Sequence, residues 1–336
     1  MGPKVEVLIL TMGEIEKLIS RKDAIDAVET AYKALGTEGQ LFQPQKQPIL
    51  LDAPENKNFL MAMPSYVKSI GVVGFKWGGV YSNQKPGIPS AWGAVIVLND
   101  PETGIPYTIM DGIAITNMRT AGGHAVVAAK HLAKKNSKTI AIIGCGAEGH
   151  SGLPAFNDFF PLEVVKIYDI KPEAMAAYKQ EMSEAVSARI IPSKSGEEAV
   201  EDADIILMAT LSQTPVVFEP WVPKGCFVAA LTRFLDLDYK LSEKVDKWVL
   251  GDKKSDGHLI VDRHKWSNHA RGVVVSWDNV YADMGEIITG VKPGRENDRE
   301  RILYTHMGMG AHDLALAQIA YNRAKEQGIG TKVRLI

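Results

Sequence analysis

The spacing of apolar and polar residues divides the chain into stretches of different character. Residues 13–35 place apolar side chains three and four positions apart, which predicts two short helices. From about residue 47 to 115, short β-rich runs are separated by Pro, Gly and Asn, as in an antiparallel sheet. The polar turn residues at 99–106 predict a hairpin connection in that sheet. Residues 117–135 predict one helix, whose basic last turn suits a helix C-terminus.

A different pattern begins at residue 139, where apolar runs alternate with helical or polar segments. The runs are apolar on both sides, which is typical of parallel strands covered by helices on both faces. They read "TIAIIG", "VVKIYD", "DADIILMAT", "CFVAAL" and "KWVLGD". A last helix, "GAHDLALAQIAYNRAKEQG", is predicted to stop at Gly328. The second half of the chain therefore predicts an α/β fold with a parallel sheet.

Composition narrows the classes of function. The 336 residues are 46% hydrophobic and carry a formal net charge of −2, so we expect no broad attraction for nucleic acid or for an anionic membrane. The length is too great for one compact core and predicts two domains. No apolar run is long enough to cross a bilayer, the N-terminal residues lack a signal-peptide pattern, and two cysteines make no disulfide framework. These features predict a cytoplasmic protein.

The first strand of the second half runs into a glycine-rich turn. "GCGAEG" at 144–149 fits the pattern G-x-G-x-x-G directly after a predicted strand. Gly144 permits the tight turn, Gly146 lets backbone N–H groups approach a pyrophosphate, and Gly149 permits close packing of a helix on the strand. A purely structural strand-to-helix turn is the alternative, but the context favours a dinucleotide site.

Asp169 lies at the end of the next predicted strand, "KIYD". A carboxylate at this position accepts hydrogen bonds from an adenosine ribose and repels a 2′-phosphate. The sequence therefore favours NAD(H) over NADP(H), although Lys171, two residues later, weakens that preference. A simple turn or helix-capping role for Asp169 is the alternative.

The segment from "GVVGFKWGG" to "NMRTAGGHAVVAAKHL" resembles the ornithine cyclodeaminase/mu-crystallin family, as do "VKPGREND" and "GMGAHDLALAQIAY". Members of that family exchange a hydride between a nicotinamide and the α-carbon of an amino or imino acid. The resemblance implies a Rossmann NAD-binding domain at 118–312. It also implies an α+β substrate-binding and dimerisation domain formed by both chain ends, 1–117 with 313–336, and a homodimer.

The resemblance implies roles for particular residues. Lys76 in "GFKW" matches the active-site lysine, and Arg119 in "NMRTA" matches the arginine that holds the substrate carboxylate. A guanidinium binds a carboxylate in bidentate fashion, and burial beside an arginine lowers the pKa of a lysine toward neutrality. Without the resemblance, both residues would be interpreted as solvent-exposed charges. Besides Arg119 and the glycines, the positions that match cofactor contacts are Ser90, Ala147, Glu148, Asp169 and Thr210.

The chain departs from the family pattern around the substrate. In cyclodeaminases the loop after the fifth Rossmann strand carries a catalytic aspartate, but "AALTRFLDLDYKL" places Arg233 there and Asp236 shortly afterwards. Either Asp236 supplies the catalytic carboxylate or that role is absent. Lys46 replaces a substrate-binding arginine, and His306 replaces a serine near the nicotinamide, where it would contact cofactor or substrate. Arg233 in place of a carboxylate disfavours diamino acids and suits a second anionic or polar group on the substrate.

We therefore expect an NAD(H)-dependent oxidoreductase that acts on the α C–N bond of a small amino or imino acid, as a dehydrogenase or a ketimine reductase. One alternative is a redox-neutral ornithine or lysine cyclodeaminase, which shows no net turnover of NADH. Another is a non-catalytic dinucleotide-binding protein, against which the retention of Lys76 and Arg119 argues. His258, His264 and His269 lie close together in sequence, but their spacings of six and five residues fit no common metal-ligand signature, and no metal is predicted.

Overall fold

The computed structural model describes residues 5–51, 58–81, 92–212, 214–231, 236–262 and 275–335. The chain divides into two compact units. Unit 1 contains residues 1–119 and 309–336, so both chain ends belong to it, and unit 2 contains residues 120–308. Among the described residues of either unit, no helix has the length and apolar composition needed to cross a membrane.

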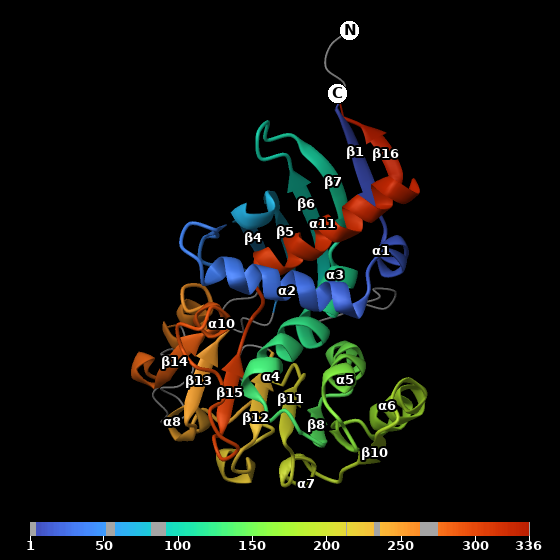
Figure 1. Cartoon of the computed structure of the whole chain (residues 1–336). Coiled ribbons are helices and arrows are strands. Elements are labelled where there is room, and N and C mark those ends of the chain that lie inside the picture. Colours follow the sequence, from blue (N-terminus) through green and yellow to red (C-terminus); the bar gives the residue numbers. More distant parts are fainter. Residues whose placement is uncertain are drawn as a thin grey trace. The chain divides into compact units, whose positions relative to one another are not determined.

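Unit 1 is built on a mainly antiparallel sheet with the strand order β16-β1-β7-β6-β5-β4-β2, in which β3 also pairs with β4 (Figure 1). Only β1 and β7 pair in parallel among the described strands of this sheet. The predicted antiparallel strands are confirmed, and so is the hairpin between β6 and β7. The strands are β1 (Glu6–Leu10), β2 (Leu41–Phe42), β3 (Ile49–Leu50), β4 (Phe59–Val67), β5 (Val72–Val80), β6 (Trp92–Asn99), β7 (Pro106–Asp111) and β16 (Thr331–Arg334).

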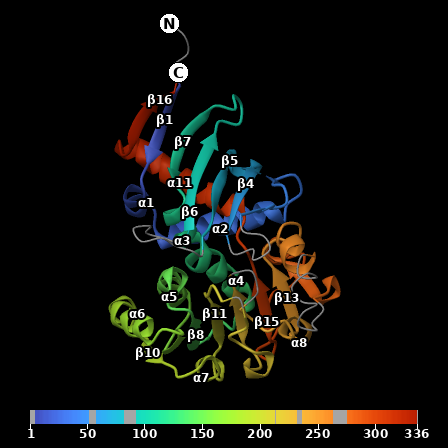
Figure 2. The ribbon, with the colours of Figure 1, turned by 180° about the vertical axis from the view of Figure 1, so that it is seen from behind.

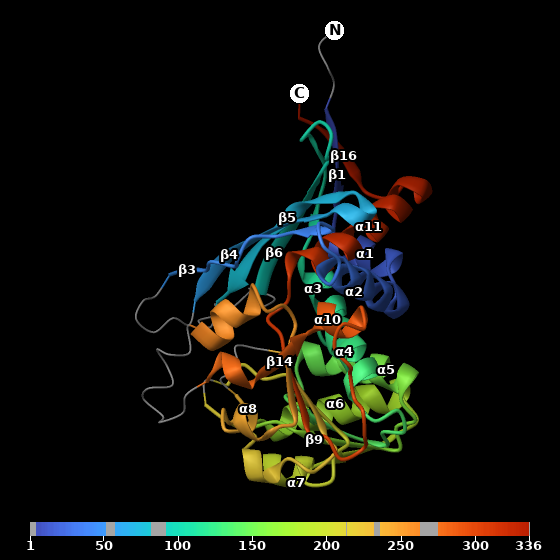
Figure 3. The ribbon, with the colours of Figure 1, turned by 60° about the vertical axis from the view of Figure 1, so that its left-hand side comes forward.

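Helices cover one face of this sheet, where α11 crosses the strands and α2 runs beside it (Figure 3). The face is apolar, since Leu314 and Leu316 of α11 share a buried core with Ile96 and Leu98 of β6. The two predicted short helices near the N-terminus are confirmed, and so is the stop at Gly328, whose φ is 66°. The helices are α1 (Met12–Leu18), α2 (Arg21–Leu35), the 3-10 turn η1 (Lys68–Ile70), α3 (Ile113–Arg119) and α11 (Gly310–Gln327).

Unit 2 contains an entirely parallel sheet with the order β10-β9-β8-β11-β12-β15-β13-β14, which confirms the predicted Rossmann-type α/β fold (Figure 2). The central strands are buried on both faces; every residue of β11 and β12, for example, is buried. The strands are β8 (Thr139–Ile143), β9 (Val164–Tyr168), β10 (Arg189–Pro192), β11 (Ile205–Met208), β12 (Phe227–Ala230), β13 (Lys247–Leu250), β14 (Val280–Asp283) and β15 (Ile302–Thr305).

The helical segments of unit 2 include α4, α5 and α6, in which α5 packs against both of the others. The single helix predicted for 117–135 is wrong in detail, because α3 is followed by a π-helical segment before α4 begins. Gly122 and Gly123 favour this irregularity, since glycine stabilises a regular helix poorly. The segments are η2 (Thr120–Ala125), α4 (Val126–Leu132), α5 (Ala147–Phe159), α6 (Pro172–Ala185), α7 (Gly196–Val200), η3 (Glu219–Trp221), α8 (Leu241–Lys244), η4 (His258–Asp262), η5 (Trp277–Asn279) and α10 (Met284–Ile288).

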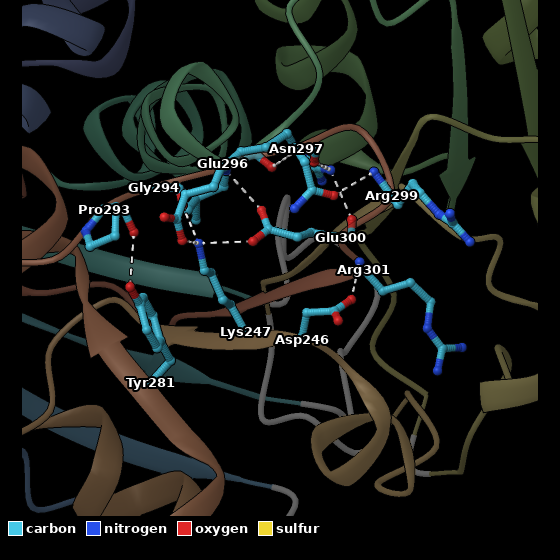
Figure 4. A network of polar contacts seen from close by, with 12 residues as sticks. Asp246, Lys247, Tyr281, Pro293, Gly294, Glu296, Asn297, Arg299, Glu300 and Arg301 are labelled. Carbon is cyan, nitrogen blue, oxygen red and sulfur yellow. Dashed lines mark hydrogen bonds and ion pairs between the residues drawn. The ribbon is translucent and has the colours of Figure 1, made fainter.

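A polar network ties the long segment before β15 to the sheet (Figure 4). The buried Lys247, at the start of β13, donates to the carbonyl oxygen of Gly294 and lies 2.7 and 3.0 Å from carboxylate oxygens of Glu296 and Glu300. Burial alone would lower the pKa of Lys247, but hydrogen bonds to Glu296 and Glu300 raise it. Lys247 is therefore one of the anchors of the polar stretch around "KPGREND", and Arg295, which donates to the carbonyl oxygen of Leu132 at 2.7 Å, is another.

Candidate functional site

The charged residues of unit 1 singled out by the sequence come together in one buried cluster. Lys76 lies in β5, and its ammonium Nζ is 2.8 Å from Oδ2 of Asp313 in α11. Nε of Arg119, the last residue of α3, donates to Oδ1 of the same carboxylate at 3.0 Å. All three side chains are at most 6% exposed. We call these residues, with the buried Lys46, the cationic cluster.

The local sequence explains how Lys76 becomes buried. Residues of β5 alternate between buried and partly exposed, and Lys76 falls on the buried face, opposite Met63 of β4 and Ile96 of β6. α11 covers this face, and its first residue, Gly310, allows a close approach: a Cβ there would lie 2.4 Å from the carbonyl oxygen of Met63. Because α11 lies so close to β4, Asp313 in its first turn reaches Lys76.

Arg119 is positioned by helix α3. Asp111, the last residue of β7, accepts hydrogen bonds from the backbone N–H groups of Ile113 and Ala114 at 3.0 and 2.9 Å. This contact caps the start of α3 directly after the strand. Arg119 then occupies the last turn of α3, directly before the π-helical segment η2. The short helix thus carries the guanidinium to the carboxylate of Asp313.

The cluster changes the acid–base properties of Lys76. Burial lowers its pKa, the neighbouring cations Arg119 and Lys46 lower it further, and Asp313 opposes them, which leaves the pKa at about 8. Burial alone would raise the pKa of Asp313, but the charges of Arg119 and Lys76 lower it. Nζ of Lys76 also donates to the Thr116 hydroxyl at 3.3 Å. A positioned amine with this pKa exchanges protons near neutral pH.

The glycine turn of unit 2 joins β8 to α5 and has the geometry that a pyrophosphate needs. Gly144 has a φ of 102°, and a Cβ there would lie 2.6 Å from the carbonyl oxygen of Ala209. A Cβ at Gly149 would lie 2.7 Å from the carbonyl oxygen of Gly144, whereas one at Gly146 would meet no atom within 4 Å. Gly146 and Ala147, the first residue of α5, are exposed. The open start of this helix offers N–H groups and a favourable dipole to a phosphate.

Two acidic side chains flank this turn. The carboxylate of Asp169, directly after β9, accepts hydrogen bonds from the N–H groups of Cys145 and Lys171, both at 2.9 Å. It therefore lies beside the turn, as a ribose-binding carboxylate must. Glu148, in the first turn of α5, accepts a hydrogen bond from the N–H of Ala121 at 3.0 Å. The residues of the turn thus fit a dinucleotide.

The structure also pairs Thr210 with Asp236. The fully buried Asp236 accepts a hydrogen bond at 2.9 Å from the hydroxyl of Thr210, which lies just beyond the end of β11. Arg233 and Ser90 lie outside the described residues, so their roles stay predictions.

His306 follows β15, and its imidazole is fully buried. Nδ1 of the ring is bonded to Oδ2 of Asp256, and the edge of one ring faces the other where His306 meets His124, with centroids 4.5 Å apart. Contact of His306 with a cofactor or substrate stays a prediction. Among the described residues, no group of three or more His, Cys, Asp or Glu side chains is placed to hold a metal ion.

Asp313 was missed by the reasoning from sequence. Its signal is visible in "GAHDLALAQIA", where one carboxylate stands in a mainly apolar stretch of a predicted helix. A charged residue among buried positions needs a partner, and the partner is a candidate for chemistry. Lys76 and Arg119, already singled out, are those partners.

The profile of the ornithine cyclodeaminase/mu-crystallin family matches residues 5–328. The chain belongs to this family. The alanine dehydrogenase of Archaeoglobus fulgidus is 32% identical over 341 aligned positions, which cover 98% of this chain and 99% of that protein. The N-((2S)-2-amino-2-carboxyethyl)-L-glutamate dehydrogenase of Staphylococcus aureus is also 32% identical, over 98% of this chain and 99% of its own.

A solved structure of Thermococcus litoralis Δ1-pyrroline-2-carboxylate reductase, in complex with NADH and L-proline, is similar over 97% of this chain and 100% of its own, with 33% identity and a TM-score of 0.87. Membership of the ornithine cyclodeaminase/mu-crystallin family thus confirms the resemblance found in the sequence, and the α/β fold is confirmed with it. The role of Asp313, whose carboxylate joins Lys76 to Arg119, was not among the expectations drawn from the resemblance.

Proposed function

We propose that this protein is an NAD(H)-dependent oxidoreductase that acts on the α C–N bond of a small amino or imino acid. The observation that carries the proposal is the buried cationic cluster, in which Asp313 joins a lysine of lowered pKa to an arginine. Relatives named alanine dehydrogenase and Δ1-pyrroline-2-carboxylate reductase, one of them solved with NADH and L-proline, support the same class of reaction.

The charge of the cationic cluster supports binding of a carboxylate. Its three basic side chains and one acidic side chain together carry a formal charge of +2 when Lys76 is protonated and +1 when Lys76 is neutral. A buried site with positive formal charge favours a ligand of negative charge. A guanidinium carries five N–H donors in a planar arrangement that suits a carboxylate, and Nε of Arg119 donates to Asp313. Arg119 and Lys46 therefore bind the substrate carboxylate and fix the α-carbon.

Lys76 accepts and donates the proton that the reaction transfers. When the amino acid is oxidised, the neutral amine of Lys76 accepts a proton from the substrate ammonium group or from the water that adds to the imine. When the imine is reduced, the protonated amine returns it. Because its pKa is about 8, Lys76 populates both forms near neutral pH. Asp313 holds the amine in place at 2.8 Å and keeps part of its basicity.

The residues of unit 2 fit the dinucleotide. The N–H groups of the glycine turn would hold the pyrophosphate, and Asp169 would bind the adenosine ribose. When bound, the nicotinamide supplies or accepts the hydride. Asp236 orients the hydroxyl of Thr210. We propose Thr210 as a cofactor contact, whereas direct proton transfer by Asp236 stays a hypothesis.

We also propose that the protein is a homodimer, as is the archaeal alanine dehydrogenase solved as a dimer with bound NAD, which has a TM-score of 0.87 at 30% identity. That match covers 99% of this chain and 100% of the other. The short strands β2 and β3 of unit 1, with the residue after β3, expose four apolar side chains: Phe42, Ile49, Leu50 and Leu51. Exposed apolar groups gathered on short edge strands suit burial against a second copy.

Turnover assays test the proposed function. The protein is mixed with NADH, ammonium and a panel of 2-oxo acids or cyclic imino acids, and with NAD⁺ and alanine, aspartate, glutamate, ornithine or lysine. We expect the NADH concentration to change with at least one monoamino or imino acid. This activity should be lost in Arg119→Met. It should be kept in Arg299→Met, the control, which alters an exposed arginine of unit 2. Conversion of ornithine or lysine without net change in NADH would instead identify a cyclodeaminase.

A further inference from the structure

Unit 2 contains a buried polar network that the proposed reaction does not use. Its members are fully enclosed: His124, Asp256, Tyr304 and His306. Oδ2 of Asp256 bonds Nδ1 of His306, and its Oδ1 accepts a hydrogen bond from the backbone N–H of Met307 at 3.4 Å. The ring of His124 packs edge-on against His306, and Nδ1 of His124 lies 3.0 Å from the Tyr304 hydroxyl.

The chain makes room for this network at Gly251. A Cβ at that position would lie 1.8 Å from Nδ1 of His306, so the ring occupies the space that any side chain would fill. The backbone around the ring is fixed as well, because the N–H of His306 donates to Ala230 of β12 and the N–H of Gly251 donates to Thr305. The imidazole is therefore locked in one position by the glycine, by Asp256 and by the strands.

The network lies at the edge of the sheet where a dinucleotide would bind. The segment 305–308 begins with the last residue of β15, at the edge of the sheet where the parallel strands end. β9, with Asp169 after it, lies on one side of β8, whereas β11, β12 and β15 lie on the other. Dinucleotides bind across the carboxyl ends of such sheets where the strand order reverses. With the adenosine ribose at Asp169, the nicotinamide half extends toward β12 and β15.

We propose that Asp256 is a positioning residue, which acts through His306 and Met307 to fix the segment 305–308 as the support for the nicotinamide half of the dinucleotide. This inference rests on the proposed function, because it presupposes a dinucleotide at the glycine turn. A buried carboxylate–imidazole pair contributes little net stability compared with apolar side chains of the same shape. The pair instead fixes the positions of the His306 ring and the Met307 N–H, the two groups that Asp256 contacts.

Affinities for two ligands test the two halves of the cofactor site separately. NADH and ADP-ribose, which lacks the nicotinamide, are titrated into the protein by calorimetry. We expect Asp256→Asn to weaken NADH binding about tenfold, as the loss of one buried charged partner does, and to change ADP-ribose binding less than about twofold. Ser255→Ala is the matched control, since it removes the neighbouring buried hydroxyl, and both affinities should stay unchanged.

Two further variants keep the proposal testable if Asp256→Asn folds poorly. Gly251→Ala displaces the His306 ring without removing a polar group and should reproduce the selective loss of NADH affinity. In a His306→Ser background, Asp256→Asn should have less than half its effect on a logarithmic scale, because the two residues act together. Equal losses for NADH and ADP-ribose, or an unchanged NADH affinity, would overturn the proposal. A wild-type protein that binds neither ligand would overturn the proposed function itself.

Discussion

Lys76 is the residue on which the proposed chemistry depends most. A lysine in a sheet is ordinarily exposed, yet here α11 covers it and its ammonium contacts Asp313. Burial and the charge of Arg119 lower its pKa to about 8. A substantial fraction of Lys76 is therefore the neutral amine at mildly alkaline pH, whereas an ordinary lysine is almost entirely protonated there.

This pKa predicts the pH dependence of both directions of the reaction. Oxidation needs the neutral amine, so its rate should rise as pH increases through about 8, whereas imine reduction needs the protonated amine and should slow over the same range. Lys76→Met should lower kcat by at least about 100-fold and leave NADH affinity unchanged. Lys138→Met, an exposed lysine of unit 2, is the control and should retain wild-type rates. A pH profile without this step would argue against proton transfer by Lys76.

Asp313 should influence the pKa of Lys76 without contacting the reacting atoms of the substrate. Because Asp313 raises the pKa that burial and Arg119 lower, Asp313→Asn should move the step in the pH profile below 8 and raise KM for the carboxylate substrate as Arg119 loses its anchor. Asp100→Asn, in an exposed turn, serves as the control. A profile of reduced height but unchanged position would indicate that Asp313 is only structural.

Reasoning from sequence found Lys76 and Arg119 through the family resemblance but could not place them. Both would be interpreted as exposed charges from their own surroundings, and their burial depends on α11, which is far away in the chain. Asp313 was missed for the same reason. A carboxylate in an apolar helix becomes informative only once the helix is known to cross the lysine-bearing strand.

Among the elements, the glycine turn between β8 and α5 contains two glycines, Gly144 and Gly146, whose substitution by alanine should have different effects. Gly144→Ala puts a side chain at a φ of 102° and 2.6 Å from the carbonyl oxygen of Ala209, so it should destabilise the fold by roughly 1–3 kcal/mol. Gly146→Ala meets no atom within 4 Å and should leave the melting temperature unchanged, yet weaken NADH binding, because its methyl group would lie where the proposed site brings the pyrophosphate close to the backbone.

Thermal melts without ligand and NADH titrations of the two variants check this contrast. If Gly146→Ala bound NADH as well as the wild type does, the turn would not hold the pyrophosphate, and the assignment of the cofactor site would fail.

Hydrophobic patterning predicted most elements because their apolar runs or helical repeats are bounded by clear turn residues. The parallel strands of unit 2 are continuous apolar runs, and α11 ends where Gly328 adopts a left-handed conformation. Patterning did not anticipate β1 and β16, which join the two ends of the chain in one sheet. A pairing between residues so far apart leaves no local signal. It also could not place the π-helical segment η2, because six residues are too few to reveal a change in helical period.

At the scale of the whole molecule, the proposed homodimer makes a prediction about surface residues. Ile49, in β3, is 54% exposed and lies among apolar neighbours, so Ile49→Lys should convert a dimer to a monomer. Val291→Lys alters an apolar residue of unit 2 that is 66% exposed and should leave the dimer intact. Light scattering coupled to gel filtration measures both. A monomeric wild type, or two variants with the same mass, would contradict the assignment of this surface.

The central claim concerns the atom that receives the hydride, and isotope transfer tests it most directly. The protein is incubated with NADH that carries deuterium at C4 of the nicotinamide, with ammonium and with the 2-oxo or imino acid on which it is most active. The product amino acid is then analysed by mass spectrometry and proton NMR. We predict one deuterium at the α-carbon, on a single face. Consumption of NADH without deuterium at that carbon would contradict the account.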